Sequence, residues 1–181
     1  EITPAQFQRL IVTSRADKLE EQAAKWTSFQ AGAYDAVIVT PQAFVRTQLQ
    51  ETAARDYLGQ VAAIQRSVKL EQRNAQHTKK PSERQRAILK HGVEAWMRER
   101  LELPKNLRPV PGVTWDAIGV DLLLVDEAAD YKNLYMPEPR EGDTPKYMGS
   151  GGSGSARAWH LDARANTVRQ RTGGAGVVLL T

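Results

Sequence analysis

The sequence predicts an α/β fold in which helices pack on a parallel sheet, and two observations lead to this class. Two apolar runs rich in Val, Ile and Leu, at 34–40 and 119–125, are bounded by turn-forming residues, as strands buried on both faces of a parallel sheet are. Segments with helical composition alternate with these runs, at 17–29 and after Ser155. Because helix followed by buried strand is the repeating unit of such a sheet, we expect parallel strands with flanking helices.

The first part of the chain predicts a strand, a helix and a second strand. A short apolar run at 10–14 precedes the helical segment 17–29, which Gly32 is placed to end. The strand 34–40 then stops at Pro41. This order fits one unit of a parallel sheet.

The middle of the chain predicts a helical hairpin inserted into the sheet domain. Apolar residues recur every three or four positions across 47–76, which marks one stripe of an amphipathic helix: Leu49, Ala53, Tyr57, Val61, Ile64 and Val68. Ser82 and Gln85 fit a capping box at the start of a second helix. Between residues 65 and 100 there are ten Lys or Arg against four Glu. This basic segment would attract a phosphate backbone, and a solvated helical face explains it equally well.

The last part returns to the sheet. Three prolines between 104 and 111 predict an extended connection, with Trp115 and Ile118 as anchors. The strand 119–125 leads directly into an acidic pair, and a Gly/Ser-rich stretch at 137–154 predicts a long loop. A helix from Ser155 to Gly173 and a buried strand at 176–181 complete the pattern.

Composition narrows the class of protein. Hydrophobic residues make up 41% and charged residues 25%, the net charge is +4, and no apolar run approaches the roughly 18 residues of a membrane span. We therefore expect a cytoplasmic, globular protein. The sequence has no cysteine, which excludes disulfides and thiolate metal sites, and its three histidines are scattered. The chain begins without methionine and stops within a predicted strand, so we expect a fragment of a longer protein.

Asp126 and Glu127 are the residues with the clearest chemical meaning. Paired carboxylates at the end of a buried strand suit one recurring task, in which one acid holds Mg²⁺ near a nucleotide phosphate and the other activates water. In open parallel sheets this edge is where ligands bind. We interpret Asp126 as the magnesium-side residue and Glu127 as the water-side residue.

The segment 125–133, Val-Asp-Glu-Ala-Ala-Asp-Tyr-Lys-Asn, resembles motif II of superfamily 2 helicases. It is similar to the DEAH-box form Asp-Glu-Ala-His-x-x-Lys-Asn of Swi/Snf-type DNA translocases. The strands 34–40 and 177–181 resemble the strand before motif II and the strand that opens motif III. The segment 155–159 resembles a helix start found in large helicases of phages and mobile elements. Those helicases are often joined to a methyltransferase.

The resemblance implies part of the first RecA-like domain of a P-loop NTPase. Residues 1–46 would begin that domain, 47–103 would be the helical insertion, and 104–181 would continue it through motif II. ATP and Mg²⁺ would be the cofactors and DNA the partner, with a phosphate-loop segment and a second RecA-like domain supplied by the same protein. The residues that would contact DNA are Lys132, Asn133 and Arg157.

Two departures from the family keep other interpretations open. Ala129 stands where the family has the motif II histidine, and no Gly-x-x-x-x-Gly-Lys followed by Ser or Thr occurs, so the isolated segment is expected to be inactive. One alternative is a catalytically silent DNA- or protein-binding module. Another is an unrelated metal-dependent hydrolase using Asp126, Glu127 and Asp130.

Some further side chains admit both a functional and a structural role. Arginines spaced along the last helix would line a DNA-backbone face or form a solvated helix surface: Arg157, Arg164, Arg169 and Arg171. Three tryptophans would stack on bases or, as we favour, pack in the core: Trp96, Trp115 and Trp159.

Overall fold

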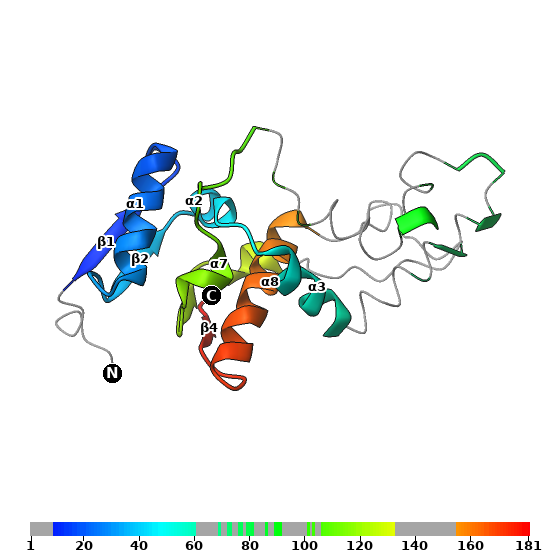
Figure 1. Cartoon of the computed structure of the whole chain (residues 1–181). Helices are drawn as coiled ribbons and strands as arrows, with labels where there is room; N and C mark the ends of the chain where they lie inside the picture. The colour runs from blue at the N-terminus through cyan, green and yellow to red at the C-terminus, as the bar shows by residue number, and fades with distance from the viewer. Residues whose placement is uncertain are drawn as a thin grey trace. The chain divides into compact units, whose positions relative to one another are not determined.

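A computed structural model describes residues 9–60, 106–132 and 155–181, with isolated positions between 69 and 103. The chain divides into two compact units (Figure 1). The first comprises Glu1–Ala53 and Leu103–Asp121, and the second comprises Ala54–Glu102 and Leu122–Thr181. Each unit contains helices and a small parallel sheet, which confirms the predicted α/β class.

The first unit contains the predicted strand, helix and strand in that order. Strand β1 (Leu10–Thr13) pairs in parallel with β2 (Ala36–Val39), with Leu10 opposite Ala36, and helix α1 (Leu19–Gln30) connects them. The chain leaves α1 through Gly32, whose φ of 75° lies in the left-handed region that glycine adopts without penalty. The predicted helix stop is therefore confirmed.

An aromatic cluster forms the core of the first unit. Trp26 on α1 meets Trp115 edge to face, with ring centroids 6.4 Å apart, and Phe44 meets Trp115 at 4.9 Å. Phe44 lies on a short helix α2 (Pro41–Arg46), and Trp115 begins the single turn α7 (Trp115–Ile118). Both predicted anchors, at the two ends of α7, are buried. These contacts fix α7, at the end of the proline-containing connection, to helices α1 and α2.

The second unit contains a second parallel strand pair. Strand β3 (Leu123–Val125) pairs with β4 (Val177–Leu179), and helix α8 (Ala156–Arg171) precedes β4. Between β3 and α8 lies a 3-10 turn, η2 (Ala128–Tyr131). The predicted end of α8 at Gly173 and the glycine after it is confirmed, since both glycines have positive φ.

Helix α3 (Glu51–Gln60) packs beside α8 (Figure 1). The Tyr57 hydroxyl is buried and donates a hydrogen bond to the Asp162 carboxylate at 2.5 Å. Burial, and then the Asp162 charge beside it, raise the pKa of Tyr57. Near the other end of the contact, the Gln170 amide donates to the Gln60 side-chain oxygen at 2.8 Å. These two side-chain hydrogen bonds therefore join the two helices.

The prediction that the strands are buried on both faces is wrong for the described residues. Val12 and Ile38, paired across the first sheet, are 52% and 54% exposed, and Leu124 is 53% exposed in the second. Each two-stranded sheet therefore exposes apolar side chains on at least one face. β3 is also shorter than the predicted strand 119–125, since Gly119 is left-handed and pairing with β4 begins at Leu123.

The prediction that Arg164 faces solvent or a DNA backbone is also wrong. Its side chain is only 1% exposed. The guanidinium donates to the His160 carbonyl at 2.9 Å and lies 3.1 Å from the Nδ1 atom of the same residue. Burial lowers the pKa of Arg164 to about 9. α8 is buried around much of its circumference, so positions seven apart do not share one environment.

Several predicted features lie outside the described residues. They are the Gly/Ser-rich loop at 137–154, Asn133, Trp96 and most of the helical hairpin in 47–103. Of that hairpin, the structure describes helix α3 and a few isolated residues. Trp115 and Trp159 are buried, which confirms their predicted place in the core. In the described parts of the chain, no helix combines the length and apolar character needed to cross a membrane.

Candidate functional site

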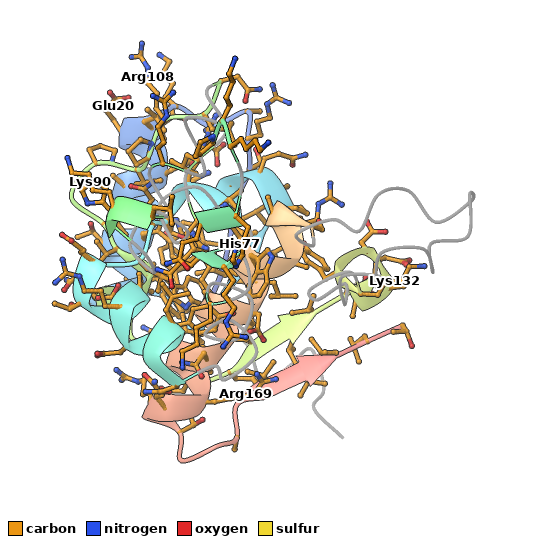
Figure 2. The ribbon with its side chains drawn as sticks, turned by 90° about the vertical axis from the view of Figure 1, so that its right-hand side faces the viewer. Glu20, His77, Lys90, Arg108, Lys132 and Arg169 are labelled. Carbon is orange, nitrogen blue, oxygen red and sulfur yellow. The ribbon has the colours of Figure 1, made fainter. Side chains whose placement is uncertain are left out.

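The acidic turn, residues 126–131, follows the carboxyl end of β3, as predicted. Backbone hydrogen bonds carry the pairing of the two strands into this turn. The Leu180 amide donates to the Val125 carbonyl at 2.8 Å, and the Ala128 amide donates to the Leu180 carbonyl at 2.9 Å. Figure 2 shows Lys132 at the far end of the turn, beyond the strands. The turn is thus fixed to the end of β4 as well as to β3.

Glu127 has an unusual backbone conformation. Its φ of 52° and ψ of 45° place it in the left-handed region, and among the described residues no other non-glycine has a positive φ. Its amide donates to the Asp126 carboxylate at 2.9 Å. This conformation costs a residue with a side chain about 1–2 kcal/mol. Such strain persists where the surrounding structure holds it, and it is concentrated at functional turns.

A positive side chain borders the acidic turn. The Arg157 guanidinium, in the first turn of α8, donates to the Asp130 carboxylate at 3.1 Å. It also lies over the Tyr131 ring, 6.0 Å from the centroid, at the outer limit of a cation–π contact. Partial burial raises the pKa of Tyr131, while the charge of Arg157 acts in the opposite direction. The first turn of α8 is therefore bound to the turn that carries the acidic pair.

The predicted site residues are placed as follows. Asp126 and Glu127 lie together at the strand end, and both are exposed. Lys132 is exposed directly after the 3-10 turn. Arg157, predicted as a DNA contact, is engaged with Asp130. Sequence reasoning missed this ion pair because 27 residues separate its partners and no periodic pattern connects them.

The acidic pair suits part of a magnesium site. Mg²⁺ is commonly held by one or two carboxylates together with water and substrate phosphates, so Asp126 offers a suitable single ligand. Within residues 9–60, 106–132 and 155–181, no three His, Cys, Asp or Glu side chains converge as a metal site. Asp130 is bound by Arg157.

A second polar cluster lies where β1 ends, and its contacts support a structural role. The Lys25 ammonium donates to the Asp17 carboxylate at 2.7 Å, and the Ser14 amide donates to the same carboxylate at 2.8 Å. These two contacts hold the pKa of Asp17 below its usual value. The buried Gln22 amide donates to the carbonyls of Ser14 and Asp17. The cluster ties the loop after β1 to α1.

Protein-family models, curated proteins and solved structures gave no match to the chain.

Proposed function

We propose that this chain is part of the first RecA-like domain of a superfamily 2, Swi/Snf-like DNA translocase that couples ATP hydrolysis to movement on DNA. The observation that carries the proposal is the strained acidic turn directly after a parallel strand. Asp126 and Glu127 lie at the carboxyl end of β3, where open α/β sheets bind ligands. The resemblance of 125–133 to motif II supplies the identity of the reaction.

In this proposal the two acids have different tasks. Asp126 holds Mg²⁺ on the ATP phosphates, and the ion neutralises charge that develops as the phosphoryl group is transferred. Glu127 orients the attacking water and accepts its proton. Both carboxylates are exposed to a ligand that approaches the strand end. The lysine-bearing phosphate loop and the arginines of a second RecA-like domain come from other parts of the same protein.

DNA is the proposed partner. Lys132 is exposed beside the acidic turn, and Asn133 follows it in the sequence. The basic segment at 65–100 would add sequence-independent attraction to phosphates. The proposed compartment is the cytoplasm.

The test is DNA-dependent ATP hydrolysis by the intact protein that contains this chain. Glu127→Gln keeps the size and polarity of the side chain but removes its ability to accept a proton. We expect kcat to fall by about 100-fold or more. Glu20→Gln, an exposed change in the first turn of α1, is the matched control and should leave kcat unchanged. Hydrolysis that ignores DNA, or a fully active Glu127→Gln variant, would contradict the proposal.

A silent DNA- or protein-binding module is the second candidate, and Ala129 favours it. The family's motif II has histidine at this position, where it would couple the nucleotide site to motif III. If the intact protein binds DNA but hydrolyses no ATP, this candidate replaces the first. The metal-dependent hydrolase alternative instead requires Mg²⁺ binding without nucleotide, which calorimetry on the chain measures directly.

A further inference from the structure

We propose that Arg157 is a positioning residue that holds the acidic turn in place through Asp130. This inference rests on the proposed function, because the turn that it holds carries the acid that would activate water. Arg157 lies in the first turn of α8, whereas Asp130 lies three residues after Glu127. The ion pair therefore fastens the proposed catalytic turn to a helix that is otherwise well buried.

The Ala128 amide fixes the first half of the acidic turn to Leu180, directly after β4, whereas the second half, from Asp130 to Lys132, depends on weaker bonds within the turn. The 3-10 segment is closed by the Asp130 amide, which donates to the Glu127 carbonyl at 3.0 Å, and by a longer 3.3 Å bond from Lys132 to Ala129. Hydrogen bonds in 3-10 turns have poorer geometry than those in α-helices. Glu127 also gains about 1–2 kcal/mol by leaving the left-handed region. A contact that restrains Asp130 therefore also restrains the strained Glu127, whose carbonyl accepts the Asp130 amide.

Two contacts on neighbouring residues make Arg157 suited to this task. Its guanidinium binds the Asp130 carboxylate at 3.1 Å and lies over the Tyr131 ring. Arginine combines a planar donor group with a face that stacks on aromatic rings, which lysine lacks. Because the side chains of Arg157 and Asp130 are 50% and 64% exposed, the pair is solvent-screened and its effect is modest.

The competing role for Arg157 is a direct contact to a DNA phosphate. The two roles predict different kinetic effects. A phosphate contact sets the DNA concentration for half-maximal activity and contributes about one unit to the salt dependence of DNA binding. A residue that positions the acidic turn acts on kcat once DNA is saturating. The existing contacts to Asp130 and Tyr131 favour the positioning role.

The experiment measures DNA-stimulated ATP hydrolysis by the intact protein with Arg157→Ala, Asp130→Asn and both changes together. We expect each single change to lower kcat about 3- to 10-fold, the double variant to be no worse than either, and Arg157→Lys to recover only part of the loss. The half-saturating DNA concentration and its salt dependence should not move. Arg108→Ala, an exposed change of equal charge in the connection before α7, is the control and should retain full kcat.

Three results would overturn the inference. They are weaker DNA binding with unchanged kcat, losses that add in the double variant, and full recovery by Arg157→Lys. A second measurement is independent of catalysis: hydrogen exchange of the amides in residues 126–132, with protection expected to fall several-fold in Arg157→Ala and in Asp130→Asn. If the parent hydrolyses no ATP, the proposed function fails, and exchange alone decides whether Arg157 holds the turn. Unchanged exchange refutes it.

Discussion

Replacing Glu127 with glycine should stabilise the fold while removing the proposed catalytic acid. The φ of 52° costs a residue with a side chain about 1–2 kcal/mol, which glycine does not incur. Glycine also lowers the free energy of unfolding by about 0.4–1 kcal/mol, because it gives the unfolded chain more conformational freedom. The side chain is exposed, so no packing is lost, and the backbone amide can still donate to Asp126. We expect Glu127→Gly to raise the free energy of unfolding by about 0.5–1 kcal/mol.

The assay is urea unfolding, monitored by tryptophan fluorescence. The free energies of unfolding are compared between variants that share the same m-value, which is the slope of that free energy against urea concentration. Glu127→Ala is the first control, because alanine keeps the unfavourable φ and should give no gain. Lys132→Gly is the second, because Lys132 has a right-handed φ of −61°, where glycine should cost about 0.5–1 kcal/mol. A glycine variant at 127 no more stable than the alanine variant would show that the left-handed conformation carries no strain.

Three further changes test other parts of the fold. Gly59 lies within α3, and a methyl group added to its Cα would meet no heavy atom within 4 Å. Gly59→Ala should therefore raise the free energy of unfolding in urea by about 0.5–1 kcal/mol. A lower free energy of unfolding would mean that other atoms fill this space. Tyr57→Phe removes the donor to Asp162 and should cost about 1–3 kcal/mol by the same measurement, whereas an unchanged midpoint would rule out the bond. The hydrogen bond from Lys25 lowers the pKa of Asp17 in the folded protein. The ionised Asp17 therefore stabilises the fold at pH values above its unfolded pKa of about 3.9, and this stabilisation is lost as pH falls through the folded pKa. Asp17→Asn should flatten the acid limb of the stability curve below about pH 4, and an unaltered limb would contradict this.

Local patterns predicted the elements that depend on neighbouring residues in the chain. The strand and helix order from β1 to β2 follows from apolar runs and turn residues, and the acidic pair follows its strand in the sequence. Helix α2 was missed because Pro41 was interpreted as a strand stop. Proline also suits the first position of a helix, where its missing amide costs nothing, and both roles hold here.

Features that depend on contacts between distant segments could not be predicted in this way. Helical spacing puts Arg157 and Arg164 on one side of α8, yet one is half exposed and the other is buried. Periodicity gives the direction of a side chain from its helix and not what lies in that direction. The left-handed conformation of Glu127 also escaped prediction, because glycine and asparagine are the residues that signal it.

The strain at Glu127 and the ion pair at Arg157 should depend on each other. A strained residue persists only where its surroundings hold it, and here Arg157 contributes to that hold through Asp130. With glycine at position 127 there is less strain to resist, so losing the arginine should matter less for stability. In a double-mutant cycle of Glu127→Gly and Arg157→Ala, we expect the cost of Arg157→Ala to fall by about 0.5 kcal/mol in the glycine background. Strict additivity would mean that the ion pair and the strained backbone are independent features of the turn.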